Sequence, residues 1–325
     1  MAVTLRDVAK DANVAMSTVS YVLSGSGLHK VSDDTCQRIL ESARRLHYRP
    51  NLKARGLSKG RTYIAGALFR QLNISFVPEI IEGLEQVLEE NGYCLILATY
   101  ASPREFTDKC NYLYQHGVEG VAVLPLFNDV QEPDIGDLAI ANIPLISIGG
   151  AGMEFPKVLV EPHAVGRTAF TYLAEMGHRN IAYAGNYPSR IHGMRFAQKK
   201  YPDVKFTWND DPVSVTGDGE SIFKFVMSLD PRPTAVLADC DIDAIAFMHC
   251  ALRNNFRIPE DFSVVGVDGL EIGAYASVPL TSVGQPTVEQ GRQGGKLLLD
   301  AMNGKNIEDC ILQPFMIERE SCRKI

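Results

Sequence analysis

The sequence predicts a small all-α head that contains a helix-turn-helix, followed by an α/β body of two doubly wound parallel-sheet subdomains. The first observation is charge: residues 1–61 carry eleven Lys and Arg against five Asp and Glu, whereas the remaining residues carry 21 against 34. The second is the helical spacing of apolar residues in the head. The third is an alternation of short apolar runs with longer amphipathic segments after Arg61. A basic segment on an acidic chain indicates that the head binds a polyanion.

The composition is that of an ordinary globular protein of 325 residues, with 46% hydrophobic and 22% charged residues. Its seven cysteines are scattered and never form a Cys-x-x-Cys pair, which predicts reduced thiols and neither disulfides nor a zinc site. Charged residues interrupt every apolar stretch near the N-terminus, so we expect no secretory signal. No run approaches the roughly 18 apolar residues of a membrane span. We therefore expect a cytoplasmic protein with no membrane partner.

The head opens on a predicted capping box, in which Thr4 caps the first helix and Asp7 returns a bond to the Thr4 backbone. Asn13 interrupts the helical pattern and indicates a turn. The apolar residues between them share one helical face and are Leu5, Val8, Ala9 and Ala12.

A second short helix is predicted from Met16 to Leu23, with Val19, Val22 and Leu23 turned inward. Two short helices around a tight turn are the arrangement with which a helix-turn-helix enters the DNA major groove. The small polar, aromatic and other side chains left outside are Met16, Ser17, Ser20 and Tyr21.

A third helix is predicted to start at Ser32, with two aspartates at its positive dipole end, and to run to about Tyr48. The alternative for the whole head is a three-helix cap whose charges are only solvated, but the net charge and the turn pattern both favour DNA binding. The core face predicted for the third helix consists of Ile39, Leu40, Ala43 and Leu46.

The body repeats a strand–helix pattern twice, which predicts parallel sheets with helices on both faces and a ligand site beyond the carboxyl ends of the strands. The predicted strands are residues 63–68, 94–98, 120–124, 144–148, 180–184, 234–238 and 262–267. The predicted helices are residues 78–91, 103–116, 132–141, 164–176, 190–200, 221–228 and 243–254. Residues 286–304 and 312–319 are expected to cross back between the subdomains.

These patterns predict three domains along the chain. The helix-turn-helix domain is residues 1–49, a linker is residues 50–61, and the α/β body, with a ligand site beyond the carboxyl ends of its strands, is residues 62–325. Within the body, we expect one subdomain at about 62–160 and 286–311 and the other at about 161–285 and 312–325.

The head resembles that of the lactose/galactose repressor (LacI/GalR) family, and the likeness continues to the C-terminus. One departure is Ala15, which stands where the family has a serine that caps the helix and contacts phosphate. The resemblance implies a periplasmic-binding-protein-like fold for the body. The matching stretches of the head are Thr4–Ala9, Ala12–Val14, Ser17–Ser20, Val31–Ser32 and His47–Asn51. The head residues that it places on double-stranded DNA are Thr4, Met16, Ser17, Thr18, Ser20 and Tyr21.

The segment Pro50–Leu57 resembles the hinge helix of the family, which implies that Leu57 enters the minor groove and kinks the duplex. Gly56 disfavours a helix by about 1 kcal/mol relative to Ala, and Lys53 is unusual for a buried dimer contact. We therefore expect the hinge to fold only on DNA; the alternative is a plain flexible linker. The hinge residues placed on DNA are Asn51, Ala54, Arg55 and Leu57.

The resemblance also implies a small-molecule effector, a sugar or sugar derivative, in the cleft between the subdomains. Arg190 matches an arginine that grips a ligand hydroxyl or carboxylate, and Asp268 matches an acid that pairs with ligand hydroxyls at a strand end. Phe76 matches an aromatic residue placed against the ligand. Cys240 and Asp241 stand where the family has Asn-Asp, and they complete the predicted effector site.

Alternatives stay open for these residues. Arg190 and Asp268 could form an ion pair between the subdomains, and Phe76 could belong to a core. Cys240 in place of asparagine, and Gly149 where many sugar-binding relatives have an acid, leave the predicted site with fewer polar groups than the family has.

The resemblance implies a transcriptional regulator, a repressor, that binds a near-palindromic operator as a homodimer under allosteric control by its effector. The sequence has no Gly-rich phosphate loop, no metal-ligand spacing of histidines and no G-x-S-x-G motif, so we expect neither enzymatic activity nor a cofactor. The alternatives are a solute-binding protein with the same body fold and a sugar-modifying enzyme. The basic head argues against the first, and the lack of a nucleophile argues against the second.

Overall fold

The computed structural model describes residues 3–24, 31–48, 60–70, 76–124, 134–150, 155–209 and 217–325. Contacts between residues divide the chain into two compact units, Met1–Tyr63 and Ile64–Ile325. The hinge residues predicted to touch DNA, which are Asn51, Ala54, Arg55 and Leu57, lie outside the described residues.

The head consists of three helices, α1 (Leu5–Asp11), α2 (Met16–Ser24) and α3 (Asp33–Arg45). The predicted capping box is confirmed: the Asp7 amide donates to the Thr4 hydroxyl, and the Thr4 amide donates to Asp7 Oδ2 over 2.8 Å. Asn13 adopts a positive φ of 51°, which allows the sharp turn between α1 and α2. The predicted helix-turn-helix is therefore present.

The core of the head joins all three helices. Its buried members are Val8, Ala9, Ala12, Val19, Val22, Ile39 and Ala43. Leu40, which we predicted in this core, is 41% exposed, so that prediction is wrong. Ile39 and Ala43 are four residues apart and share one face of α3, whereas Leu40 is turned about 100° away from Ile39 by the helical repeat.

A polar contact also ties the first helix of the head to the third. Ser42 is buried and donates to Asp11 Oδ2 over 2.5 Å, and Arg45 donates to the same oxygen. These bonds lower the pKa of Asp11, the Ser42 bond most of all. The orientation of α1 relative to α3 is thus held by both apolar and polar contacts.

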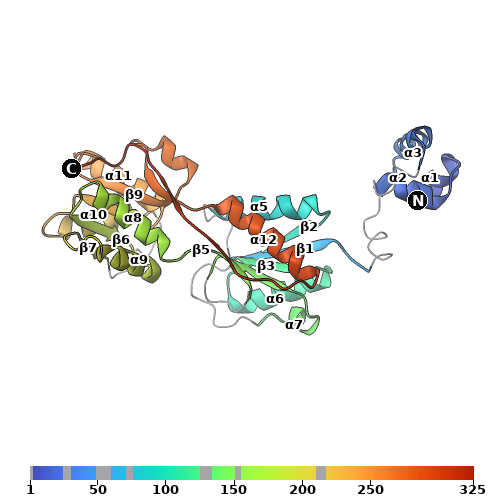
Figure 1. Cartoon of the computed structure of the whole chain (residues 1–325), viewed down its shortest axis with the longest axis horizontal. Helices are drawn as coiled ribbons and strands as arrows, with labels where there is room; N and C mark the ends of the chain where they lie inside the picture. Colours follow the sequence, from blue (N-terminus) through green and yellow to red (C-terminus); the bar gives the residue numbers. More distant parts are fainter. Residues whose placement is uncertain are drawn as a thin grey trace. The chain divides into compact units, whose positions relative to one another are not determined.

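The first sheet of the body has six parallel strands in the order β11-β5-β4-β3-β1-β2 (Figure 1). Helices α5 (Val77–Glu90) and α12 (Thr287–Met302) lie side by side over one face, and α6 (Pro103–Gln115) and α7 (Asp137–Ile140) lie over the other. The strands are β1 (Ile64–Phe69), β2 (Cys94–Thr99), β3 (Val121–Leu124), β4 (Leu145–Ile148), β5 (Lys157–Val160) and β11 (Cys310–Leu312).

The second sheet has the order β12-β10-β9-β8-β6-β7, with β12 antiparallel to β10 and the other pairs parallel. Side chains on one face of this sheet pack under α8 (Ala164–Glu175) and α9 (Pro188–Gln198). Side chains on the other face pack under α10 (Gly219–Ser228) and α11 (Asp241–Arg253). The strands are β6 (Asn180–Ala184), β7 (Lys205–Trp208), β8 (Ala235–Ala238), β9 (Ser263–Asp268), β10 (Thr281–Gly284) and β12 (Phe315–Ile317).

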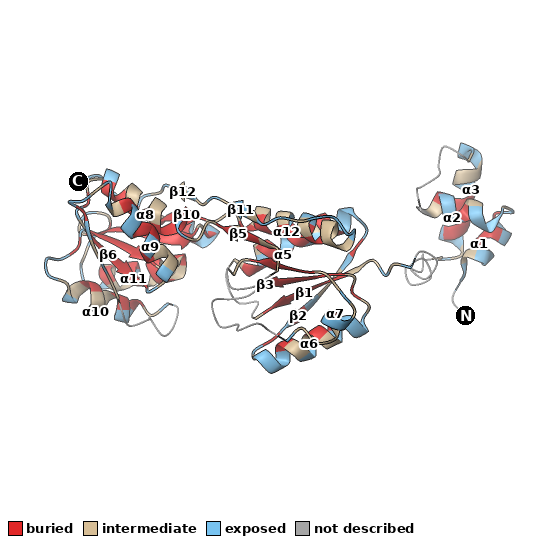
Figure 2. Cartoon of the chain, turned by 60° about the horizontal axis from the view of Figure 1, so that its bottom comes forward, coloured by how far each residue is buried: buried red, intermediate tan, exposed pale blue. Residues whose placement is uncertain are grey.

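Buried residues follow the strands and the inner faces of the helices, as Figure 2 shows. Central strands such as Val121–Leu124 and Ala235–Ala238 are buried at every position, because helices cover both faces of each sheet. This arrangement confirms the predicted α/β body with two parallel-sheet subdomains. The chain passes from one sheet to the other three times, after β5, after β10 and after β11.

All seven predicted strands are present. The prediction omitted β5, β7, β10, β11 and β12, whose runs are short or partly polar, such as Lys205–Trp208 with alternating exposure. The helix predicted at 132–141 is reduced to the four residues of α7 within the described range. Across the described ranges, no helix combines the length and the apolar character needed to cross a membrane.

Candidate functional sites

The outer face of α2 is the candidate DNA-reading surface. Met16 and Tyr21 are 53% and 46% exposed, although both are large and apolar in part, while Val19 and Val22 on the opposite face are buried. Ser17 and Ser20 are exposed beside them, and Thr18 is half-buried. A short helix anchored by its valines thus presents hydroxyl, aromatic and thioether groups, which can bond or contact base edges in a major groove.

Ala15 precedes α2, and its side chain has no oxygen that could cap the helix. The amides of Thr18 and Val19 donate to the main-chain oxygen of Ala15 over 3.0 and 3.2 Å. Thr4, also predicted to contact DNA, is exposed, and its hydroxyl donates to Asp7 Oδ2 over 2.7 Å. The roles of these head residues on DNA stay predictions.

Four of the five residues predicted to bind an effector come together at the carboxyl ends of strands in the second sheet. Arg190 is near the start of α9, which follows β6; Cys240 and Asp241 follow β8; and Asp268 ends β9. Phe76, the fifth, is half-buried and directly precedes α5, which follows β1 of the other sheet. We call the cluster at the second sheet, together with Asp239 and Gln285, the strand-end site.

Arg190 is held by Asp239, which directly follows β8. Its Nη1 lies 2.5 Å from Asp239 Oδ1 and also donates to the main-chain oxygen of Asp239, and the two side chains are 12% and 34% exposed. The guanidinium also lies over the ring of Tyr187, 5.1 Å from its centroid. Burial disfavours the charged guanidinium, but Asp239 with Tyr183 and Asp268 outweighs burial and raises the pKa of Arg190. Arg190 is therefore a permanent cation with one nitrogen already bound.

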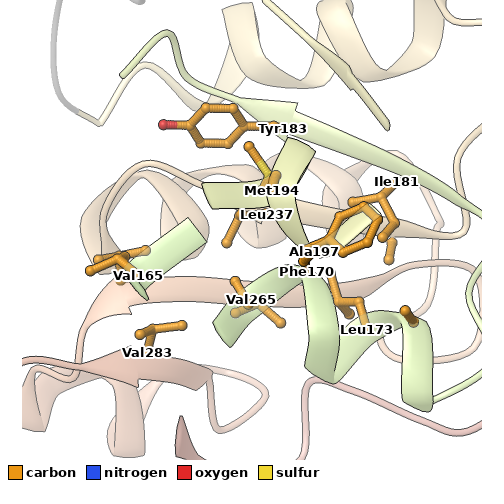
Figure 3. Close-up of a cluster of buried hydrophobic side chains, with 14 of the residues drawn as sticks. Val165, Phe170, Leu173, Ile181, Tyr183, Met194, Ala197, Leu237, Val265 and Val283 are labelled. Atoms are coloured by element: carbon orange, nitrogen blue, oxygen red, sulfur yellow. The ribbon is translucent and has the colours of Figure 1, made fainter. Parts of the chain in front are cut away.

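Tyr183 connects this ion pair to the hydrophobic core. Its hydroxyl donates to Asp239 Oδ1 over 2.5 Å and accepts from the Tyr187 amide over 3.3 Å. The ring is fully buried in the core under α8 and α9, and Figure 3 shows the hydroxyl oxygen at the edge of that cluster, directed away from it. Burial, with the Asp239 charge, raises the pKa of Tyr183. The orientation of Asp239 thus depends on a side chain fixed by core packing.

Asp268 ends β9 with a positive φ of 111°, which is rare for a residue with a side chain. Its side chain is 8% exposed, and its Oδ1 accepts from Gln285 Nε2 over 2.8 Å. Burial raises its pKa to about 7; Arg190 and the Gln285 bond act against this, and the charges of Asp241 and Asp239 add to it. The carboxyl group is thus poised to change charge near neutral pH.

Asp241 lies at the predicted strand end, and its carboxylate is engaged by the protein itself. It is fully buried at the start of α11, its Oδ1 accepts from the Ser282 hydroxyl over 2.5 Å, and its Oδ2 accepts from the Leu270 amide over 2.6 Å. A side chain on Gly266 would overlap Asp241 Oδ1. Burial raises the pKa of Asp241 to about 6 against these hydrogen bonds. Its geometry is that of a brace between α11, β10 and the loop after β9.

Cys240 is the residue before α11 and is half-buried. Burial, with the Asp243 charge, raises the pKa of its thiol, so this cysteine is a neutral group at neutral pH. Asp243 is itself buried and accepts from the Gly217 amide over 2.6 Å. The N-terminal turn of α11 therefore contains two carboxyl groups beside a neutral thiol.

Sequence reasoning missed Asp239, Tyr183, Tyr187 and Gln285. Asp239 and Gln285 directly follow β8 and β10, and a polar residue after the apolar run of β8 is the signal that could have identified Asp239. Gln285 had a weaker signal, because β10 is itself partly polar. Tyr183 had no such signal, because it lies inside a strand and only its hydroxyl reaches the site. Among the described residues, no three or more His, Cys, Asp or Glu side chains are grouped to hold a metal ion.

Comparison with known proteins identifies the family of the chain. Residues 4–51 match the family described as bacterial regulatory proteins, lacI family, and residues 170–322 match a periplasmic binding protein-like domain. The chain is 30% identical over 341 residues to the HTH-type transcriptional repressor PurR of Vibrio cholerae serotype O1 (strain M66-2), covering 99% of this chain and 98% of that protein.

Two further proteins extend the comparison. The catabolite control protein A of Priestia megaterium is 27% identical over 332 residues, which cover 98% of each chain. Among solved structures, the lac repressor dimer bound to operator and the anti-inducer ONPF has a TM-score of 0.81 at 20% identity, over 99% of this chain and 100% of that one. At this identity the structural likeness bears on the fold alone.

Proposed function

Because this chain belongs to the lacI family of bacterial regulatory proteins, we propose that α2 reads base edges in the major groove through Met16, Ser17, Ser20 and Tyr21. The chain is a DNA-binding transcriptional repressor controlled by a small molecule, and not an enzyme. The observation that supports the reading role is the exposure of Met16 and Tyr21 on a helix whose other face is anchored in the core. Thr4 and Thr18 contribute phosphate contacts that position the helix.

The repressor acts as a homodimer on a near-palindromic operator, so that two heads enter successive major grooves. Between them, Asn51, Ala54 and Arg55 contact the backbone, and Leu57 inserts into the minor groove. This hinge role rests on the sequence. Contacts from basic residues to phosphates make the affinity fall steeply with salt. A repressor of this kind works where the chromosome is, in the cytoplasm.

The strand-end site is the effector site. Arg190, Asp239, Asp268 and Gln285 offer donors and acceptors at the carboxyl ends of neighbouring strands, which is where α/β proteins bind ligands. Phe76 contributes an apolar surface from the other subdomain, and Cys240 contributes an uncharged thiol. Asp241 acts indirectly, by holding the loop after Asp268.

The effector controls DNA affinity through the three chain crossings between the subdomains, at about residues 160, 285 and 312. These crossings mark the subdomain boundaries we propose, 62–160 with 286–311 and 161–285 with 312–325. Effector binding changes the angle between the subdomains and thereby shifts the folding equilibrium of the hinge helix. The affinities for operator and effector are therefore reciprocally coupled.

The test is selection of an operator by the full-length protein from a randomised duplex library, followed by the same selection with Met16→Ala and Tyr21→Ala. Each substitution is expected to relax the sequence preference by about 1–3 kcal/mol at one base position of each half-site. Phe196→Ala, at an exposed aromatic on α9 of the body, is the matched control and should leave the selected sequence unchanged. Unchanged preferences in both head variants would contradict the reading role of α2.

A chain that starts at Thr62 separates the two activities, because the contacts of the head and the body lie within separate units. It is expected to bind the effector and to lose operator binding. Full operator affinity in this truncated chain would contradict the assignment of the head.

A further inference from the structure

The strand-end site contains more negative than positive charge, which bears on what it can bind. Arg190 is the cation that acts on both Asp268 and Asp243, and its Nη1 is already bound twice by Asp239. Asp239, Asp243 and Asp268 therefore share one guanidinium. Burial raises the pKa of Asp268 and Arg190 acts against it, while the charges of Asp241 and Asp239 raise it further, as expected where several carboxyl groups lie near one cation.

The helix terminus beside the site does not restore a positive field. The N-terminus of an α-helix can bind an anion through its free amides and dipole. In α11, however, the first turn already contains Asp241 and Asp243, and the residue before it is the neutral Cys240. The positive end of the dipole of this helix is therefore already offset by the protein's own carboxyl groups.

An anionic ligand would have to displace Asp239 from Arg190 and approach Asp268 and Asp243. A neutral polyol would find acceptors on Asp268 and Asp239 but would leave the excess charge uncompensated. A ligand with an ammonium group would make charge-assisted hydrogen bonds to the same carboxylates and balance their charge. The one-third exposure of the Asp239 side chain leaves it accessible to such a group.

We propose that the effector is a polyhydroxylated molecule with a protonated amine, of the amino-sugar class, and that Asp239 selects for the amine. This inference rests on the proposed effector role of the strand-end site. Asp239 binds the ammonium group, Asp268 and Gln285 bind hydroxyl groups, and Arg190 positions Asp239, so that a ligand carboxylate or phosphate would compete with Asp239 for the guanidinium.

The test is a thermal-shift and calorimetric comparison of the full-length protein at pH 7 with a panel of hexoses in matched forms: the amino sugar, its N-acetyl derivative, the neutral sugar, the 6-phosphate and the uronic acid. Saturable binding of an amino sugar, at least tenfold tighter than its N-acetyl, neutral and anionic counterparts, is the expected result. The N-acetyl derivative keeps the substituent at the same carbon and removes the charge.

Asp239→Asn provides the second arm, because it removes the selecting charge and releases Arg190. This variant is expected to bind the amino sugar at least tenfold more weakly and the uronic acid or 6-phosphate more tightly than the wild type. Glu308→Gln is the charge-matched control: it removes one exposed carboxylate near β11 of the other sheet and should leave both affinities unchanged. If Asp239→Asn does not fold, the wild-type comparison still decides the question.

The outcomes separate this inference from the proposed function. Tighter binding of the neutral or anionic forms to the wild type, or undiminished amino-sugar binding by Asp239→Asn, would overturn the selection for an amine and leave the effector site intact. If none of the five forms of the sugar binds to a protein that still binds its operator, the effector role of the strand-end site is refuted, and this inference with it.

Discussion

Gly166 in α8 lies directly against the main-chain carbonyl of Arg190 in α9, so closely that a Cβ at this position would overlap the carbonyl carbon and oxygen. A second glycine, Gly193, makes the reciprocal approach to the His163 carbonyl. The two helices are thus brought together by backbone contact, and Arg190 is positioned by a residue that has no side chain.

Gly166→Ala is expected to move α9 and with it Arg190, because the new methyl group meets main chain, which cannot rotate away. We expect a loss of stability of about 1–3 kcal/mol and at least a tenfold weaker response to effector. Chemical unfolding and ligand titration measure the two effects. Gly291→Ala is the matched control, since its Cβ would overlap the Ile80 carbonyl across the α5–α12 contact of the other sheet. It should lose similar stability and keep its effector affinity; an equal loss of affinity in both variants would show that Gly166 acts only through stability.

Asp241→Asn distinguishes a brace from a ligand contact. The asparagine oxygen can accept from the Leu270 amide, but its NH2 group would then face the Ser282 hydroxyl, which loses the acceptor it donates to. Loss of a buried hydrogen bond of this kind costs about 1–3 kcal/mol. We expect that loss in the free energy of unfolding and an unchanged ranking of ligands in the binding assay. A changed ranking with unchanged stability would favour direct ligand contact.

Ala15→Ser supplies the missing side-chain cap of α2. The serine hydroxyl can accept from the free amides of the first turn, and such caps stabilise a helix by about 1 kcal/mol. Slower hydrogen exchange of the α2 amides and a several-fold higher operator affinity are the expected results. Ala15→Val lacks the hydroxyl and is as poor an N-cap residue as alanine, so it serves as control. Faster or unchanged exchange in the serine variant would show that the start of α2 does not limit the stability of the head.

The stability of the body should depend on pH through Asp268. Its folded pKa of about 7 lies above the ordinary value, so the folded state holds a proton that the unfolded state has lost. The stabilisation is complete below about pH 4 and is lost as the pH rises through about 7, at up to about 1.4 kcal/mol per pH unit. The groups that act on this carboxyl are Arg190, Asp239, Asp241 and Gln285.

Unfolding of the wild type and of Asp268→Asn at several pH values between 4 and 8 measures this contribution. The difference between the two proteins should change between about pH 4 and about pH 7 and level off above that, because the asparagine does not titrate. A constant difference would show that Asp268 is ionised in the folded protein throughout.

Local sequence patterns were sufficient to predict the structure where residues close in sequence are also close in space. The Thr4–Asp7 capping box is formed by residues three apart, and the buried central strands of the two sheets are recognisable in the sequence as apolar runs. They failed at Leu40, where apolar character did not decide which side of α3 faces the core. They also failed at β11 and β12, whose three residues each become strands only because a neighbouring strand is present to pair with them.

The sequence by itself determined the helix-turn-helix head, the two parallel-sheet subdomains and the identity of Arg190 and Asp268 as polar residues of interest. The head and the subdomains follow from spacing and charge within short segments, whereas Arg190 and Asp268 were singled out by the resemblance to the LacI/GalR family. Only the tertiary structure decided that Asp239 holds Arg190, that Tyr183 holds Asp239, and that Asp241 braces a loop. These partners lie 29 to 56 residues apart in the chain, and burial in a shared low-dielectric site, which no local pattern encodes, gives their charges their effect.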